Sequence, residues 1–384
     1  MSDNGASNHG DNRSLEAMRA NIDAIDREVL RLLSERDGMV GEIAGYKRNH
    51  SVPIRDPRRE NEIITDRREH AIALGLKPDT VEGIYRLVMW ASRDRQAALK
   101  AEVPLDMEPR TVAVVGGKGA MGGCMAGMFS ELGHSVLIAD LDTELTPVEA
   151  AKSADIVVIS VPIDCTVEVI RQLGPHVRED ALLTDVTSTK TEPVRAMLES
   201  TRANVVGMHP LFGPSVHSLQ GQRIALTPDR GGEWMDWLEK MFKARGLVTI
   251  RTTPQDHDRA MAVVQVLTHF STEATGLALA RYGVPFDKTL EFTSPVYQIE
   301  ILMTARHFAQ SPDLYASIQM SNPETPAVID ALKRAIESLE KAVVDGDREA
   351  VSKTFEEVRS YFGAFTDRAL EQSSYLIDRL VERS

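Results

Sequence analysis

The sequence predicts a multidomain protein in which one α/β domain stands between two all-α domains. Residues 14–100 carry apolar residues at helical spacing. Residues 110–254 alternate short apolar runs with helical stretches, as a parallel sheet with crossover helices does. Long periodic runs return from residue 255 to residue 384. We expect a disordered polar tail at 1–13 and a proline-containing linker at 101–109.

Composition excludes several classes of protein. The chain has 384 residues, 42% of them hydrophobic and 26% charged, which is typical of globular proteins. No apolar run reaches the ~18 residues needed to span a membrane. The net charge of −13 disfavours general binding to nucleic acid. The two cysteines, Cys124 and Cys165, lack metal-type spacing and indicate a reducing cytoplasm rather than a disulfide scaffold.

The first domain opens with apolar residues recurring every three, four or seven positions between Ile22 and Ile43. Proline first interrupts this run at Pro53, so one helix of roughly 30 residues or more is predicted. Such a helix needs a hairpin or a second chain to bury its apolar stripe. Asp56 and Pro57 read as an N-cap and a first-turn proline, and they start a second helix that ends near Leu74. A third helix is expected at about 78–100.

Cations occupy particular positions on the first helix. Arg36 and Lys47 are 11 residues apart, which places them on one face. Arg19 lies about 100° around the helix from Arg36, so it can reach an equivalent site in a second subunit rather than this one. Three cations with nearby polar groups suggest a pocket for a small dicarboxylate. The alternative is a set of solvated surface charges.

Residues 15–100 also resemble the all-helical chorismate mutase family, through the runs 18–26 and 53–60 and through Ser92 with Gln96. The resemblance implies that Arg19 of one subunit and Arg36 of the other bind the carboxylates of chorismate. Lys47 and Gln96 would donate to the ether oxygen of the breaking bond, and the neutral Gln96 implies activity at neutral pH. The remaining pocket residues implied by the family are Asp56, Arg59, Glu60, which would hold the ring hydroxyl, and Ser92.

The stretch from Thr111 to Asp140 predicts a dinucleotide site of the Rossmann type. A short apolar run at 111–115 is followed by Gly117, Gly119 and Gly122 in the pattern G-x-G-x-x-G, then by a helical run and a second strand at 135–139. We expect Gly117 to permit a tight turn, Gly119 to admit a pyrophosphate and Gly122 to let helix and strand pack closely. Asp140 would bond a ribose 2′-hydroxyl and repel a 2′-phosphate, which favours NAD over NADP. A glycine-rich turn without a cofactor is the alternative.

Further strands are expected at 155–162, 182–185 and 205–208. The carboxyl ends of parallel strands meet at one edge of a sheet. That edge should hold the residues Ser160, Thr187, Ser188, Lys190 and His209. A histidine beside a dinucleotide site can take the proton of a hydroxyl that is being oxidised, although His209 is equally compatible with capping a turn.

The C-terminal third should be helical. His257, Gln265 and His269 lie on its first helix, and the two histidines are about 120° out of phase, so we expect no metal site. Each histidine is compatible with a substrate contact or with a plain interhelical contact. Amphipathic helices from about 329 to 344 and from 348 onward favour packing between subunits in a dimer.

Residues 110 to about 375 resemble prephenate dehydrogenases, through Gly-Gly-x-Gly-x-Met-Gly at 116–122, Ser160-Val-Pro-Ile, Ser188-Thr-Lys190 and His209-Pro-Leu-Phe-Gly-Pro. With the first domain, the chain is similar to the bifunctional chorismate mutase–prephenate dehydrogenase family, the T-proteins of tyrosine biosynthesis. The resemblance implies that His209 bonds the C4 hydroxyl of prephenate while Ser160 orients His209 and the nicotinamide. The cofactor contacts it implies are Gly117, Gly119, Met121, Gly122, Asp140, Ser160 and Pro162.

The same resemblance places Arg306 on the ring carboxylate of prephenate, His269 near the pocket for substrate and inhibitor, and Lys190 as a supporting cation. It also implies a homodimer and feedback inhibition by tyrosine. Gln298 stands where related proteins often carry arginine, which leaves the charge balance of the pocket open.

Two other functions compete with this interpretation. The first is a prephenate or arogenate dehydrogenase whose helical domain only binds a regulatory ligand, which the complete set of mutase residues disfavours. The second is a non-enzymatic NAD sensor, which His209 and Arg306 disfavour.

Overall fold

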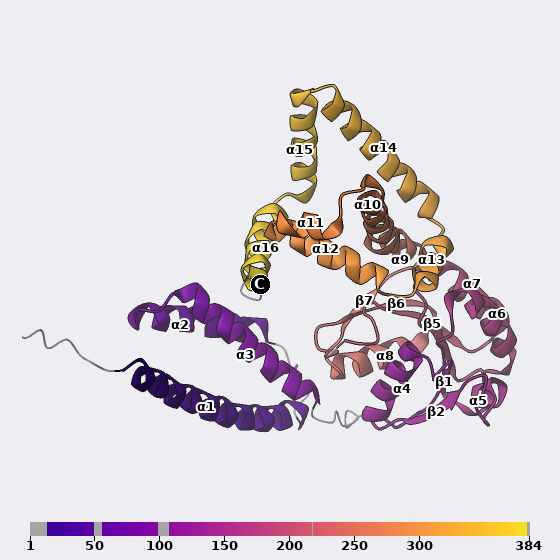
Figure 1. Ribbon diagram of the computed structural model, residues 1–384. Coiled ribbons are helices and arrows are strands. Elements are labelled where there is room, and N and C mark those ends of the chain that lie inside the picture. The colour runs from indigo at the N-terminus through magenta and orange to yellow at the C-terminus, as the bar shows by residue number, and fades with distance from the viewer. Residues whose placement is uncertain (1–13, 50–55, 99–106, 217, 382–384) are drawn as a thin grey trace, which may run out of the picture.

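The computed structural model describes residues 14–49, 56–98, 107–216 and 218–381, which form three successive parts (Figure 1). The predicted tail at 1–13 and most of the predicted linker lie outside these residues. Within them, no helix is both long enough and apolar enough to cross a membrane.

The first part consists of helices α1 (Leu15–Asn49), α2 (Pro57–Ala73) and α3 (Pro78–Ala98). The 35 residues of α1 confirm the predicted long helix. The predicted start of α2 is also confirmed, because the Asp56 carboxylate accepts a hydrogen bond of 3.0 Å from the backbone N–H of Arg59. Helix α3 packs against both α2 and α1.

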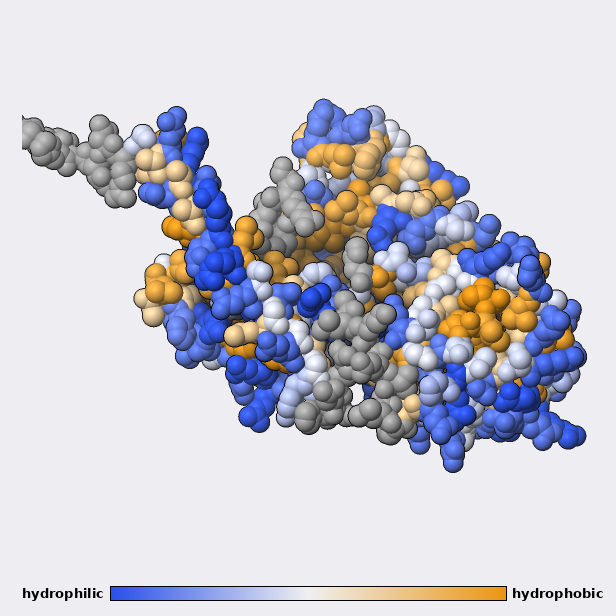
Figure 2. Space-filling model, turned by 90° about the horizontal axis from the view of Figure 1, so that it is seen from below, coloured by the Kyte–Doolittle hydropathy of each residue, from blue (hydrophilic) through white to orange (hydrophobic). Residues whose placement is uncertain are grey.

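Most of the apolar stripe of α1 is exposed. Ile22, Ile25 and Val29 in its first half are about half exposed or more, with Ile25 at 63%. Burial against the hairpin is confined to the second half, at Val40 and Ala44. Apolar side chains accordingly reach the surface over the N-terminal helices (Figure 2). Among the described residues, the hairpin of α2 and α3 therefore buries apolar side chains only in the second half of α1, and the first half has no apolar partner.

The second part is a seven-stranded sheet with the order β2-β1-β3-β4-β5-β6-β7. All neighbours are parallel except β5 and β6, which are antiparallel. The strands are β1 (Thr111–Val115), β2 (Ser135–Ala139), β3 (Ile156–Ile159), β4 (Leu182–Asp185), β5 (Asn204–Pro210), β6 (Arg223–Arg230) and β7 (Val248–Arg251). The predicted strands at 111–115, 135–139 and 182–185 are confirmed.

The sequence interpretation did not anticipate β6 and β7, or the antiparallel pairing that they bring. It also ended the fifth strand too early. Strand β5 continues through His209, because His209 pairs with Ala225 of β6. His209 is therefore held in a sheet rather than in the loop that follows it.

Helices cover both faces of the sheet. One core contains Val112 and Val114 of β1 with side chains of α4 and α8, and the other contains Ala113 and Val115 with side chains of α5, α6 and α7. This alternation is the two-residue period of a strand that is buried on both faces. The helices of this part are α4 (Ala120–Glu131), α5 (Pro147–Ser153), α6 (Ile163–Leu173), the short 3-10 helix η1 (Gly174–His176), α7 (Thr191–Ser200) and α8 (Gly232–Ala244).

The glycine loop between β1 and α4 corrects one expectation. The left-handed turn lies at Gly116, where φ is 79°, and not at Gly117. A Cβ atom at Gly117 would lie 2.8 Å from the side chain of Ile138 and 3.0 Å from the carbonyl oxygen of Val114. A Cβ atom at Gly122 would lie 2.2 Å from the carbonyl oxygen of Gly116. Gly122 therefore lets α4 pack against the loop, as expected, and Gly117 is required by packing against β2.

The third part is helical, as predicted. It begins with α9 (Pro254–Met261), η2 (Ala262–Leu267) and α10 (Thr268–Tyr282), of which η2 is π-helical. The remaining helices are α11 (Phe286–Glu291), α12 (Pro295–Phe308), α13 (Pro312–Ser321), α14 (Thr325–Val344), α15 (Arg348–Phe362) and α16 (Phe365–Val381). Helix α13 packs on α6 and α9 packs on α7, which joins this part to the sheet.

Two glycines of α4 test the loop packing. We expect Gly122→Ala to lower the unfolding temperature, since the new methyl group overlaps Gly116 and overpacking costs about 1–3 kcal/mol. Gly127→Ala on the same helix is the control. A Cβ there has nothing within 4 Å, so this change should be neutral or stabilising by up to about 1 kcal/mol. Equal melting temperatures in thermal unfolding of the two variants would contradict the close approach.

Candidate functional site

Polar side chains from all three N-terminal helices converge at the second half of α1. Arg36 of α1 donates a hydrogen bond to the hydroxyl of Ser92 on α3. Ser92 is buried, and its carbonyl oxygen accepts a hydrogen bond of 3.1 Å from the Gln96 amide. The Oε1 atom of Gln96 is buried without a hydrogen-bond partner among the described residues. A buried amide that is only half satisfied suits a site that receives a polar ligand.

Lys47 faces the start of α2. Burial lowers the pKa of its ammonium group, and the carboxylates of Asp56 and Glu60 partly offset this effect. Glu60 in turn pairs with Arg93 of α3, with Oε1 2.6 Å from Nη1 of Arg93. Cations and carboxylates thus alternate where the three helices meet, an arrangement that suits a ligand with both carboxylate and hydroxyl groups.

Two predicted pocket residues lie elsewhere in the single chain. Arg19 is exposed on the first half of α1, about 26 Å along the helix from Arg36 at 1.5 Å per residue. Arg59 is exposed and lies 3.4 Å from Glu62 on its own helix. The roles assigned to these two arginines stay predictions.

The loop from Gly116 to Gly122 forms a cradle for a pyrophosphate. Gly119 is the N-cap of α4 and has no side chain to satisfy the free N–H groups of the first turn. Those N–H groups and the positive end of the helix dipole suit phosphate oxygens. A Cβ at Gly119 would lie 3.2 Å from the carbonyl oxygen of Gly116. Because glycine has no Cβ, a ligand can approach the backbone closely at this position. The residues present therefore fit a dinucleotide.

Asp140 lies directly after β2 and beside this loop. Its Oδ2 atom accepts a hydrogen bond of 3.0 Å from the backbone N–H of Lys118. The Lys118 ammonium group is 2.8 Å from Asp142. Two carboxylates, Asp140 and Asp142, thus lie beside the glycine loop, and the ammonium group of Lys118 is already paired, an arrangement that disfavours a 2′-phosphate.

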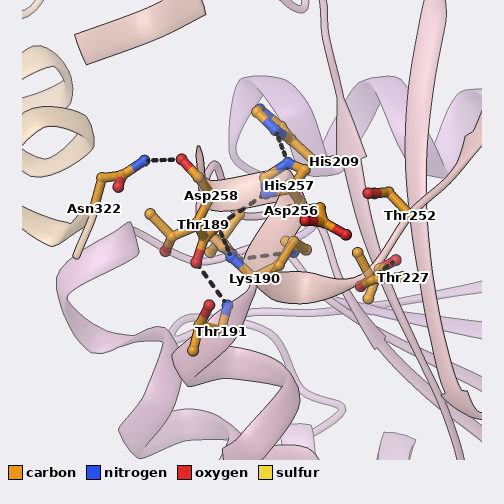
Figure 3. A network of polar contacts seen from close by, with 12 residues as sticks. Thr189, Lys190, Thr191, His209, Thr227, Thr252, Asp256, His257, Asp258 and Asn322 are labelled. Carbon is orange, nitrogen blue, oxygen red and sulfur yellow. Dashed lines mark hydrogen bonds and ion pairs between the residues drawn. The ribbon is translucent and has the colours of Figure 1, made fainter. Parts of the chain in front are cut away.

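The second polar centre is a buried relay at the far end of β5 (Figure 3). Nδ1 of His209 is 2.9 Å from Nε2 of His257, and Nδ1 of His257 is 2.9 Å from Oδ1 of Asp258. A carboxylate can only accept, so His257 donates from Nδ1 and accepts at Nε2 from His209. The remaining nitrogen of His209, Nε2, then has a free lone pair and can take a proton.

Burial holds the pKa of His209 well below its ordinary value of 6.5, and the neighbouring His257 and Lys190 lower it further. Asp258 behaves in the opposite sense. Burial raises its pKa, but hydrogen bonds from His257, Thr191 and Lys190 outweigh burial and leave the pKa lowered. A neutral base anchored by an ionised carboxylate is the arrangement that general-base chemistry near neutral pH requires.

Lys190 supports this centre from below. It is fully buried, its ammonium group pairs with Asp185, and it donates a hydrogen bond of 2.7 Å to the carbonyl oxygen of Met208. Burial lowers the pKa of Lys190, and Asp185 partly offsets this. The Lys190 stem passes Gly207, where a Cβ would lie 3.1 Å from its Cδ and 2.4 Å from the hydroxyl of Thr227. Direct contact between Lys190 and a substrate stays a prediction.

The other predicted dehydrogenase residues occupy separate positions. Ser160 follows β3, and its backbone N–H donates to the carbonyl oxygen of Val115. Within the described residues, His209 is hydrogen-bonded by His257 and not by Ser160.

His269 packs edge-on against Tyr315, with ring centroids 4.7 Å apart. Burial lowers the pKa of His269, and the neighbouring His307 lowers it further. Arg306 is exposed on α12 and close enough to Tyr315 to influence its pKa. The roles of Ser160, Pro162, Met121, His269, Arg306 and Gln298 stay predictions.

Sequence reasoning did not assign His257, Asp258 or Gln265 to the site, although His257 and Gln265 were considered. The amide nitrogen of Gln265 lies 3.5 Å from Nε2 of His209. Helical periodicity places His257 and Gln265 about 80° apart on a regular helix. The π-helical turn of η2 alters that phase, and no sequence pattern used above signals such a turn. The described residues contain no cluster of three or more His, Cys, Asp or Glu side chains that could hold a metal ion.

Three family models match the chain. Chorismate mutase type II matches residues 18–97, the nucleotide-binding domain of prephenate dehydrogenase matches 125–251, and the dimerization domain of prephenate dehydrogenase matches 253–357.

Full-length relatives share this organisation. The T-protein of Haemophilus influenzae is 33% identical over 368 residues, which are 95% of this chain and 97% of that protein. The T-protein of Enterobacter agglomerans is 36% identical, over 94% of this chain and 97% of that protein. Among solved structures, prephenate dehydrogenase from Aquifex aeolicus matches with a TM-score of 0.55 and 22% identity, over 65% of this chain and 98% of that one. This last likeness shows the fold of the second and third parts.

The fold and the two centres define an enzyme with two activities, in which a helical mutase precedes an NAD-dependent dehydrogenase. The chain belongs to the T-protein family, the bifunctional chorismate mutase–prephenate dehydrogenases of tyrosine biosynthesis.

With His209 as the expected base, its lowered pKa predicts the acidic limit of the dehydrogenase. We expect kcat/KM for prephenate to stay level as the pH falls through 6.5 and to decline only below it, since protonation of His209 removes the base and its pKa is below the ordinary value. The measurement is the pH profile of NADH formation at saturating NAD. His176→Gln, a partly exposed histidine on η1, is the control and should keep the same profile. An acidic limb centred at or above pH 6.5 would contradict the burial argument.

Proposed function

We propose that the two activities act in sequence on one pathway intermediate. The helical domain rearranges chorismate to prephenate, and the dehydrogenase part oxidises and decarboxylates prephenate to 4-hydroxyphenylpyruvate. The convergence of Arg36, Lys47 and Gln96 supports the first step, and the relay from Asp258 to His209 beside a dinucleotide fold supports the second.

The rearrangement is pericyclic and needs no nucleophile or acid–base pair. The pocket acts by holding a compact conformer of chorismate and by stabilising negative charge that develops on the ether oxygen. Lys47 and Gln96 are the donors for that oxygen. Arg36, held by Ser92, binds one carboxylate, and Glu60, held by Arg93, accepts from the ring hydroxyl. Since Gln96 needs no protonated carboxyl group, the mutase works at neutral pH.

In the dehydrogenase step the C4 hydroxyl of prephenate lies against Nε2 of His209. NAD supplies the acceptor for the hydride that leaves C4. His209 receives the hydroxyl proton while the ring carboxylate departs as CO₂, and the electron pair of the broken carbon–carbon bond completes the aromatic ring. The proton then returns from His209 to the phenol oxygen, so the reaction releases no net proton. Arg306 binds the ring carboxylate until it leaves, since a guanidinium group matches a carboxylate well.

We propose further that tyrosine inhibits the dehydrogenase and that the enzyme works in the cytoplasm. Tyrosine carries the hydroxyphenyl ring of the product, and a complex of Aquifex aeolicus prephenate dehydrogenase holds hydroxyphenyl propionate together with NAD⁺. The same NADH assay tests the inhibition: rates that do not change at millimolar tyrosine would exclude it.

A homodimer completes the mutase site in this proposal. The exposed first half of α1 carries both the apolar stripe and Arg19. Pairing two copies of α1 buries the stripe and brings Arg19 of one subunit to the pocket of the other. The dimerization-domain match at 253–357 supports the same assembly.

One assay separates the two sites. Wild-type protein with NAD should form NADH from prephenate and from chorismate. Lys47→Met should keep the prephenate signal and lose the chorismate signal by about 10²-fold or more, because a transition-state donor is removed. His209→Asn should lose both NADH signals by about 10²–10⁴-fold while chorismate is still consumed.

If the wild-type protein forms NADH from prephenate but not from chorismate, the chain is instead a dehydrogenase with a regulatory helical domain. If the wild-type protein forms no NADH from either substrate, the proposed function is wrong, and arogenate and NADP are the next substrates to test.

Subunit mixing tests the shared mutase site. Arg19→Ala and Lys47→Met should each abolish mutase activity alone. After denaturation and refolding together in equal amounts, about a quarter of the activity should return, because half of the dimers are mixed and each has one intact site. Recovery should be absent when Arg36→Ala replaces Arg19→Ala in the mixture, since Arg36 and Lys47 belong to the same subunit's pocket. Activity in Arg19→Ala alone would contradict the cross-subunit role.

A further inference from the structure

Nε2 of His209, the nitrogen that does not contact His257, has a polar neighbour. The side-chain amide of Gln265 lies over it, with its nitrogen 3.5 Å from Nε2 of His209. Gln265 comes from η2, the π-helical turn between α9 and α10. Such turns often occur at functional sites, because the extra residue aims a side chain that a regular helix would turn away.

The other end of this amide has no partner. Oε1 of Gln265 is buried and forms no hydrogen bond with any residue that the structure describes. The two ends of an amide group are nearly alike in shape, so they can exchange places. In either orientation, one end faces His209 and the other stays unsatisfied. Buried polar groups without a partner are rare in proteins, so the amide is held beside His209 although one of its ends gains no hydrogen bond there.

The hydrogen-bond directions from Asp258 to His209 determine that Gln265 acts as a donor toward Nε2 of His209. Asp258 accepts from His257, and His257 accepts from His209, so Nε2 of His209 is an acceptor. Without substrate, the amide N–H of Gln265 is the group that faces this acceptor. A hydroxyl that donates its hydrogen to Nε2 presents its oxygen to the same N–H. As the hydroxyl proton moves to His209, that oxygen gains negative charge, and a donor aimed at it becomes more favourable.

We propose that Gln265 is a second contact for the reacting hydroxyl of prephenate, with its N–H donating to the hydroxyl oxygen while the hydroxyl donates to His209. This rests on the proposed function of the dehydrogenase site. Together the two contacts fix the C4–O bond, and so the direction in which C4 presents its hydrogen to the cofactor. Gln265 thereby orients the substrate and stabilises the oxygen during the transfer, and His209 handles the proton.

Two substitutions distinguish this role from simple packing. Gln265→Met keeps the size and removes the amide, so kcat/KM for prephenate should fall about 10–100-fold while KM for NAD is unchanged. Gln265→Glu places a carboxylate next to His209, which favours the imidazolium form, so the acidic limb of the kcat/KM profile should move to higher pH. A purely structural role would leave the rate of the methionine variant unchanged, and the limb of the glutamate variant reports whether the side chain at position 265 faces Nε2 of His209.

Control measurements separate a loss of the Gln265 contact from misfolding and from failure of the proposed function. Val264→Gln changes the neighbouring residue, which is 58% exposed, and should leave the dehydrogenase unaltered. Chorismate consumption by each variant reports that the chain is folded. If wild-type protein forms no NADH from prephenate, the proposed function fails. If the wild type is active and Gln265→Met retains its rate within about twofold, or if Gln265→Glu leaves the acidic limb unmoved, the role of Gln265 is overturned and the function stands.

Discussion

The dehydrogenase site depends on the four hydrogen bonds that meet at Asp258. Its carboxylate accepts from the backbone N–H groups of Lys190 and Thr191, at 2.8 and 2.9 Å, and from His257. Its backbone carbonyl oxygen accepts from Asn322 of the C-terminal helices. The two N–H groups are at the N-terminus of α7, where a negative charge is favoured by the helix dipole. One residue therefore ties the sheet to the helical part and orients His257, which in turn holds His209, the base of the proposed dehydrogenase step.

The mutase half follows a different physical logic. Its polar side chains bridge three helices, with Arg36 of α1 donating to the hydroxyl of Ser92 and Arg93 of α3 paired with Glu60 of α2. No buried base is needed, and the charged side chains there are only partly buried, although Ser92 is buried. The proposed function thus assigns to one chain a site that stabilises a rearranging dianion by complementary charge and a site in which a base is buried away from water. Each property depends on a different degree of burial.

Much of this could be predicted from sequence, because it follows from local rules. The N-cap at Asp56, the length of α1, the strand–glycine–helix order at 111–140 and the position of His209 at a strand end all arise from short patterns. What failed depended on contacts distant in sequence. The extension of β5 through His209 requires pairing with β6, and the left-handed turn fell at Gly116 because Gly117 packs against Ile138 of β2. His257 joins the relay only through the docking of α9 on α7, and Gln265 is positioned by a π-helical turn.

Gly207 has a consequence for how this site can vary. Its backbone is an ordinary strand conformation within β5, which any residue could adopt, yet a single methyl group there would overlap Thr227, Val194 and the stem of Lys190. The Cβ would lie 2.4 Å from the Thr227 hydroxyl and 2.8 Å from Val194, so both side chains would have to move, and overpacking of this kind costs about 1–3 kcal/mol. The position is thus restricted by volume and not by torsion angle. The strand that carries His209 thus depends on a space of one carbon atom between Thr227, Val194 and Lys190, a constraint that mutational tolerance at a strand position does not ordinarily include.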